Sequence, residues 1–343
     1  MAKKPRRGLV MGAGGVLGAA WSCGALVALE DVYGFDPRDA DIIIGTSAGS
    51  VLAALLGAGV SARDLRDHQL GVPITSGPLN GFSWDYEKAV PARPGLPRWL
   101  GPGSGKLLRS SARRLRQMPP TAVLSGFLPQ GSGSMERIGH LVDAVTPMGE
   151  WSPHPNVWIC AMNYHTGARV AFGRNGSPRA ELTEAVQASC SIPAWFKPFP
   201  IGDEQYVDGG ACSATSVDLL ANEDLDEVYV IAPMVSFAMD HPDNVIARLE
   251  RRWRVQVTKR CLHEVEKVRA RGADVVVIGP GPEDLEAIGA NLMDTSRRLN
   301  VLNTSLRTSA QALRDPDNVG PDHLAGVGEA HYAVWVGPIA PCG

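Results

Sequence analysis

The sequence predicts an α/β fold with buried parallel strands, because strand patterns alternate with glycine turns and apolar helices. Residues 8–11 form a strand pattern that runs through a glycine-rich loop, residues 12–18, into an apolar helix over 19–32. Further β-branched runs are typical of strands buried on both faces and lie at residues 42–44, 227–232 and 273–278.

Length and composition indicate a globular protein. The chain has 343 residues, 44% of them hydrophobic, which is enough for a large core. A net charge of −3 provides no field that attracts nucleic acid, so we expect no nucleic-acid partner. The six cysteines are scattered, without C-x-x-C pairs or metal-type spacing, so we expect no metal and no disulfide framework.

The N-terminal residues suggest no secretion signal. Residues 1–7 are basic, but no signal-peptide core follows them, and the longest apolar run, about 48–60, is too short to span a bilayer. We therefore expect a cytoplasmic protein in a reducing compartment, with peripheral membrane attachment left open.

The loop at 12–18 is a candidate anion site, because backbone N–H groups at the start of a helix attract negative charge. It can hold a phosphate or stabilise an oxyanion. A dinucleotide site needs G-x-G-x-x-G and an acidic residue at the end of the second strand. Here the spacing is G-x-G-x-x-x-G, and Glu30 and Asp31 end the helix instead. A dinucleotide-binding oxidoreductase stays as an alternative.

The second strand pattern ends in G-T-S-A-G, residues 45–49. This motif predicts a nucleophile elbow, in which Ser47 lies on a sharp strand-to-helix turn and Gly45 and Gly49 avoid collisions. A small-residue helix over 48–56 follows, as an elbow requires. The alternative is an ordinary serine at a helix N-cap.

Residues 71–150 change character, since prolines, glycines and arginines replace the apolar periodicity. We interpret this segment as an insertion or lid over the active site. Within it, residues 106–118 form a basic amphipathic pattern whose apolar positions are Leu108, Ala112, Leu115 and Met118. Such a helix either lies on an anionic membrane or packs on the body of the protein.

The later chain returns to the sheet. A hairpin is predicted over 157–164 and 169–172, a helix over 181–188, and a strand over 205–207 that delivers Asp208 to a glycine turn. A long charged helix follows, with its arginines expected in solvent beside acidic residues and one apolar face: Leu249, Trp253, Val257, Cys261, Val265 and Val268. Residues 285–313 appear as a further helical pattern, and we expect one domain over 1–313 with a turn-rich tail over 314–343.

Three motifs in this order resemble the patatin-like phospholipases, a family of serine acyl hydrolases. They are the loop at 12–18, G-T-S-A-G at 45–49, and the pair A-S-C-S-I-P-A-W-F-K-P at 188–198 and Y-V-D-G-G at 206–210. The resemblance covers roughly 8–65 and 157–232, and more weakly 273–305. It implies a three-layer α/β/α sandwich with a mostly parallel sheet and a lipid or acyl ester substrate, without a cofactor.

The resemblance also implies the chemistry. Ser47 would attack the acyl carbonyl, and Asp208 would take its proton directly, as a Ser-Asp dyad without histidine. The oxyanion hole would consist of backbone N–H groups at Gly14, Gly15 and Ala48. The motif glycines are Gly12, Gly18, Gly45, Gly49, Gly209 and Gly210.

The chain departs from the family at one position. The family loop usually carries Arg or Lys where this chain has Leu17, so a strongly anionic headgroup preference is not expected. The pattern leaves two alternatives: a Ser-His-Asp triad of the α/β-hydrolase type, for which no histidine is singled out, and a catalytically weak lipid-binding scaffold. If no histidine acts, activity should not fall near pH of about 6.5.

Overall fold

The computed structural model describes residues 4–86, 94–95, 101–114 and 118–315. Within them, one eight-stranded sheet has the order β5-β6-β3-β2-β1-β7-β8, with β4 also paired to β3. Strands β3, β2, β1, β7 and β8 run parallel; β4 and β6 pair with β3 in antiparallel fashion, and β5 pairs with β6, again antiparallel. The strands are β1 (Arg7–Met11), β2 (Ile42–Thr46), β3 (Val157–Asn163), β4 (Arg169–Phe172), β5 (Phe199–Ile201), β6 (Glu204–Asp208), β7 (Glu227–Ile231) and β8 (Asp274–Ile278).

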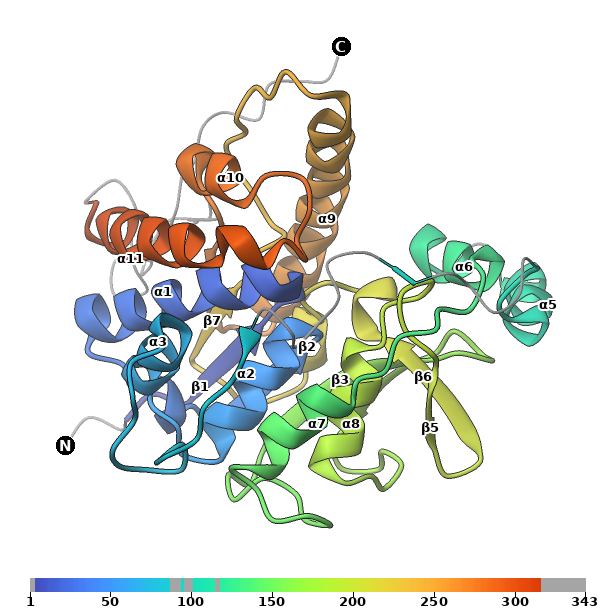
Figure 1. Cartoon of the computed structure of the whole chain (residues 1–343), viewed down its shortest axis with the longest axis horizontal. Coiled ribbons are helices and arrows are strands. Elements are labelled where there is room, and N and C mark those ends of the chain that lie inside the picture. Colours follow the sequence, from blue (N-terminus) through green and yellow to red (C-terminus); the bar gives the residue numbers. More distant parts are fainter. Residues whose placement is uncertain (1–3, 87–93, 96–100, 115–117, 316–343) are drawn as a thin grey trace.

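Helices cover both faces of this sheet, as Figure 1 shows for the face toward the viewer. The described α-helices are α1 (Gly15–Tyr33), α2 (Ala48–Gly57), α3 (Ala62–Leu70), α5 (Gly105–Arg114), α6 (Pro120–Phe127), α7 (Glu136–Asp143), α8 (Leu182–Cys190), α9 (Val245–Arg269), α10 (Pro282–Ile288) and α11 (Arg298–Arg314). Short 3₁₀ turns lie at η1 (Pro37–Asp39), η2 (Gly209–Ala211), η3 (Val217–Leu220) and η4 (Thr295–Arg297).

Alternating strand side chains divide the core into two layers. Leu9, Met11 and Ile43 face the larger layer, which α1, α2, α8 and α11 cover. Val10 and Ile44 face the other layer, which η3 and the C-terminal half of α9 cover. This alternation follows from the two-residue period of a strand. The predicted three-layer α/β/α fold with a mostly parallel sheet is confirmed.

Local signals set the helix ends. Ser61 begins α3 with a capping box, since its side chain accepts the Asp64 N–H and the Asp64 carboxylate accepts the Ser61 N–H. Gly34 and Gly71 end α1 and α3 in the left-handed conformation, with φ of 63° and 74°. α1 has the length and apolar composition of a membrane span, but 67% of that window is buried, so it is a core helix here.

The long charged helix differs most from expectation. α9 occupies the predicted place, but Leu249 and Trp253, two of the residues predicted for its packed face, are 58% and 42% exposed. The arginines expected in solvent include Arg251 and Arg254, which are 6% and 0% exposed. Hydrophobic periodicity predicted the wrong buried face for the first half of this helix. Arginine side chains can be buried there because carboxylates and carbonyls accept hydrogen bonds from their N–H groups.

Only part of the segment 71–150, predicted as an insertion or lid, is separate from the body of the protein. α7 packs on α8 and α2 and belongs to the body of the protein. α5 buries Leu107 in a small cluster with Tyr164 and Met162, which favours the packed alternative for the basic helix. The predicted position Leu115 lies outside the described residues, as does the side chain of Ala112.

The C-terminal helical pattern is interrupted. α10 ends at Ile288 and α11 begins at Arg298, because Gly289 adopts a φ of 70° and the chain turns through η4. Of the predicted tail, residues 316–343 lie outside the described part. The five cysteines that the structure describes are all buried and unbridged.

Candidate active site

β3 brings Ser47 and Asp208 together. Thr46, the last residue of β2, lies opposite Cys160 of β3, and Asp208, the last residue of β6, lies opposite Ala161. β4 occupies the other edge of β3 at both positions, so β2 and β6 share one edge and end at adjacent places. Two residues 161 positions apart in the sequence thereby become neighbours.

Ser47 has the backbone strain of an elbow. Its φ of 54° and ψ of −124° are rare for a residue with a side chain. A side chain at Gly49 would place its Cβ 2.1 Å from the Met11 carbonyl oxygen, and one at Gly45 would come within 2.5 Å of the Gly49 oxygen. Both glycines are therefore required by close backbone approach, as predicted.

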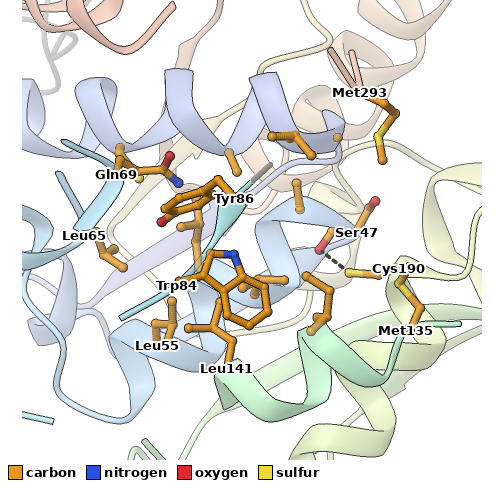
Figure 2. Close-up of a pocket in the computed structure, with 18 of the residues that line it drawn as sticks. Ser47, Leu55, Leu65, Gln69, Trp84, Tyr86, Met135, Leu141, Cys190 and Met293 are labelled. Atoms are coloured by element: carbon orange, nitrogen blue, oxygen red, sulfur yellow. Dashed lines mark hydrogen bonds between the residues drawn. The ribbon is translucent and has the colours of Figure 1, made fainter. Parts of the chain in front are cut away.

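The second signature fixes this turn. The Ser47 N–H donates to Ser189 Oγ at 2.9 Å, and Ser189 Oγ donates to the Cys160 carbonyl at 2.6 Å. The Ser47 carbonyl accepts from Ser50 Oγ at 2.6 Å and from Cys190 Sγ at 3.3 Å, and Figure 2 draws the latter contact. The sequence signature did not assign these roles. The small side chains of Ser189 and Cys190 at the C-terminal end of α8 are the signal that could have suggested them.

Asp208 is buried, at 5% exposure, beside the serine. Its Oδ1 accepts the Gly210 N–H at 2.7 Å, and its own N–H donates to the Ser191 carbonyl. Burial raises the pKa of Asp208 from 3.8 to about 6, against the smaller lowering effects of hydrogen bonds from the Ser47 side chain and the Gly210 amide. Such a carboxylate is more basic than a solvated one, which suits proton transfer near neutral pH.

The glycine loop offers free backbone donors. Gly12 N–H bonds to the Ile231 carbonyl and Ala13 N–H to the Ala214 carbonyl, which anchors the loop between β7 and the segment after Asp208. Among the described residues, no hydrogen bond engages the N–H groups of Gly14, Gly15 or Ala48. These are the three predicted oxyanion donors.

The other motif glycines allow close packing. A Cβ at Gly18 would lie 3.2 Å from Pro233, and one at Gly12 would lie 3.2 Å from the Ile231 oxygen. Gly209 approaches β3, where a Cβ would lie 2.4 Å from the Cys160 oxygen, and Gly210 approaches Asp208 itself. Leu17 is fully buried, so its side chain is part of the core.

Two cavities meet at Ser47. The smaller, of about 100 Å³, is largely apolar and is bounded by Val51 and Leu52 of α2 and by Trp84. Figure 2 shows Ser47 on one side of it and Leu65 and Gln69 on the opposite side. We call it the closed cavity.

The larger cavity, of about 570 Å³, we call the open cavity. It contains Ser47, Asp208, Gly14 and Gly15, and it extends to Leu124 of α6 and Trp253 of α9. Arg260 is its one cationic lining residue among those described, and the sequence pattern did not single it out. A substrate at Ser47 can thus place an apolar chain in the closed cavity and its remaining part in the open cavity.

Histidine is not placed to complete a triad in the described part of the chain. His68 lines the closed cavity, but its Nδ1 is hydrogen-bonded to the Tyr86 hydroxyl at 2.6 Å, and burial lowers its pKa to about 4. His154 bonds to the Ala40 carbonyl, and His165 lies beside Glu204. His241 and His263, the other two considered from sequence, line neither cavity.

The family model for the patatin-like phospholipases matches residues 9–221, which is more than half of the chain. The chain belongs to the patatin-like phospholipase family. It is therefore a lipid acyl ester hydrolase, and this family membership decides against the dinucleotide-binding alternative. Among the described residues, no group of three His, Cys, Asp or Glu side chains is arranged to hold a metal ion.

The chain is similar to solved structures of two larger proteins. VipD from Legionella pneumophila is 13% identical, with a TM-score of 0.39 over 89% of this chain and 68% of VipD. The type III effector protein ExoU is 16% identical, with a TM-score of 0.33 over 90% of this chain and 53% of ExoU, so the chain spans about half of ExoU. No curated protein matches the sequence.

Glu264 of α9 supports the oxyanion loop from a distance. Its Oε2 accepts from Ser213 Oγ and Thr215 Oγ1, each at 2.9 Å, and from the Val217 N–H at 3.2 Å. The segment it holds includes Ala214, whose carbonyl accepts the Ala13 N–H. Glu264 is 2% exposed, whereas the sequence pattern predicts that the acidic residues of this charged helix lie in solvent.

We expect Glu264→Gln to lower kcat about tenfold with little change in KM. A small displacement of the backbone N–H groups in the glycine loop weakens their stabilisation of the transition state. An amide keeps one acceptor oxygen and places an NH₂ group near Arg260. Steady-state kinetics measure this, with Glu266→Gln, on the exposed side of the same helix, as the control. Equal kcat values for both variants would show that the Glu264 contacts do not position the loop.

Proposed function

We propose that the chain hydrolyses fatty acyl esters of phospholipids through a Ser47–Asp208 dyad. The observation that carries this is the single β3 edge that sets the strained serine beside a buried carboxylate, with three free backbone N–H groups nearby. In this mechanism Asp208 takes the proton of Ser47 as the hydroxyl attacks the carbonyl. The N–H groups of Gly14, Gly15 and Ala48 stabilise the oxyanion.

Asp208 then returns the proton to the departing alcohol and later activates the water that releases the acyl group. The acyl chain occupies the closed cavity, whose apolar walls exclude water. The headgroup occupies the open cavity, where the exposed part of Arg260 supports a phosphate-bearing substrate even though Leu17 supplies no charge. The cytoplasmic location expected from sequence remains part of this proposal.

A fluorophosphonate probe tests the nucleophile. We expect stoichiometric labelling of the native chain and none of Ser47→Ala, because only a serine activated by a base reacts with the phosphorus centre. Hydrolysis of a fatty acyl phospholipid should be lost in the same variant. Ser177→Ala, in a turn away from both cavities, should label like the native chain. A native chain that does not react would favour the catalytically weak scaffold.

The closed cavity predicts acyl chain preference. Val51→Phe should narrow this cavity and lower kcat/KM for long-chain acyl esters about tenfold relative to butyryl esters. The larger side chain overpacks the cavity, and a long acyl chain then buries less apolar surface in it. A chain-length series of esters measures the ratio. Leu124→Phe, which changes the open cavity, should leave the preference unaltered. If Leu124→Phe alone shifts the preference, the acyl chain lies in the open cavity.

A further inference from the structure

The first half of α9 presents apolar side chains to solvent. Val245 and Ile246 are 66% and 67% exposed, and Leu249 and Trp253 follow at 58% and 42%. These positions lie on one side of the helix, since they span less than a third of a turn around its axis. A row of exposed large apolar residues is unusual on a soluble surface and marks a contact site.

Hydrogen bonds hold α9 in this rotation. Arg251 donates to both oxygens of Asp240 and to the carbonyls of Leu285 and Gly289. Arg254 donates to Glu250 and to the Pro233 carbonyl. Turning the helix to bury its apolar side would break these bonds and leave buried charges without partners, which is strongly unfavourable. The apolar side is thus a stable surface of the folded chain.

The exposed row continues to the mouth of the open cavity. Trp253 lines that cavity together with Leu124 of α6. Leu124 and the nearby Phe127 are themselves 54% and 59% exposed. We call this surface the entrance face; its residues are Leu124, Phe127, Val245, Ile246, Leu249 and Trp253. Figure 1 shows the first turns of α9 at the top of the view and α6 at the right, both beyond the central sheet.

Charge along α9 beside the entrance face is positive, although the exposed carboxylate of Asp243 lies just before the helix. Arg248, Arg252 and Lys259 are exposed and follow one flank of α9, and Arg260 is exposed near Trp253. Within Val245–Arg260, which the structure describes throughout, no carboxylate is exposed, because Glu250 is enclosed by Arg251 and Arg254. An apolar row flanked by cations matches a helix that lies in the interface of an anionic membrane.

We propose that the entrance face docks on an anionic phospholipid surface and opens the Ser47 cavity directly to the lipid layer. Docking places Val245 and Leu249 among the acyl chains and the flanking arginines among the headgroup phosphates. This location differs from the basic helix at 106–118, whose Leu107 is packed inside the protein. The inference deepens the proposed function, because it supplies the route by which a phospholipid reaches the serine.

Vesicle sedimentation tests the docking on the full chain carrying Ser47→Ala, which should not consume the lipid. We expect binding to equimolar phosphatidylcholine and phosphatidylglycerol vesicles that weakens with salt, and weaker binding to phosphatidylcholine alone. Adding Val245→Ser and Leu249→Ser should weaken binding at least about tenfold, because two buried apolar side chains are lost. Met148→Ser, an exposed methionine outside the entrance face, is the control.

Arg248→Gln with Arg252→Gln should remove most of the preference for the anionic vesicles. Equal binding of the Val245→Ser, Leu249→Ser variant and its parent, or no sedimentation with either vesicle, would overturn the proposal. If the native chain is a dimer in sedimentation equilibrium and the Val245→Ser, Leu249→Ser variant is a monomer, the entrance face binds a second copy of the chain. That result would also overturn the proposal.

Turnover of a soluble butyryl ester separates docking from catalysis. With Ser47 intact, the Val245→Ser, Leu249→Ser variant should hydrolyse this ester at the native rate, because neither residue lines a cavity. Vesicle binding by a chain that hydrolyses no ester would refute the proposed function and support docking. Hydrolysis without vesicle binding would refute docking alone.

Discussion

Replacing Asp208 by asparagine is expected to lower kcat/KM by about 10²–10⁴ while leaving the fold intact, because a positioned general base contributes that much. The asparagine keeps the shape and can accept the Gly210 N–H. It cannot take the proton of Ser47. Asp203→Asn, on the exposed β5–β6 turn, is the matched control and should retain native activity.

The same variant should be more stable than the native chain above pH of about 6. Because the folded-state pKa of Asp208 is raised to about 6, the native chain loses stability as pH rises from its unfolded value, 3.8, to about 6. The loss is about 3 kcal/mol at pH of about 8 and vanishes below pH of about 4. Thermal unfolding at both pH values measures this difference.

Loss of activity together with higher stability in Asp208→Asn identifies a functional carboxylate. Replacing a carboxylate with a purely structural role would lower both the activity and the stability. Because an asparagine followed by glycine deamidates readily, Asp208→Ala provides a second measurement. Full activity in Asp208→Ala would eliminate the dyad.

The pH profile of the native enzyme follows from the same carboxylate. Because only ionised Asp208 accepts a proton, kcat/KM should rise up to pH of about 6 and then level off. Burial thus brings the titration of Asp208 close to the histidine range, so a fall in activity near pH of about 6 would not by itself indicate a Ser-His-Asp triad. If the residual activity of Asp208→Ala still rises up to pH of about 6, a group other than Asp208 causes this pH dependence.

Gly49→Ala is expected to destabilise the fold by about 3 kcal/mol or more, because overpacking against backbone cannot be relieved by a side-chain rotation. The added Cβ would lie 2.1 Å from the Met11 carbonyl oxygen and 2.7 Å from that of Gly12. Relief requires α2 to move away from β1, which also displaces Ser47 from the glycine loop.

Urea unfolding measures the change in the free energy of unfolding. Gly105→Ala is the control, since a Cβ at the start of α5 meets no atom within 4 Å. The control should be neutral or slightly stabilising. A similar midpoint for the two variants would show that the elbow does not depend on the contact between α2 and β1.

Sequence patterns predicted the parts of the site that are local in the chain. The strand, glycine and helix around Ser47 require one another within about ten residues, so G-T-S-A-G could be interpreted without coordinates. The buried strands were predicted from β-branched runs for the same reason. The three motifs in order were sufficient to indicate the family.

Long-range features were not predictable in this way. Glu264 and Arg254 have the polarity of solvated helix residues, and only their acceptors and donors in distant segments explain their burial. The exposure of Leu249 and Trp253 follows from the same bonds, because the rotation that buries the arginines turns the apolar residues outward.

The sequence by itself determined the strained serine turn, the small-residue requirement around it and the family. Tertiary structure decided that β6 ends beside β2 on β3, and this sets Asp208 next to Ser47 and raises its pKa through burial. Strand pairing across 161 positions and desolvation by the surrounding fold are non-local effects. A residue's own neighbours in the chain carry no information about either.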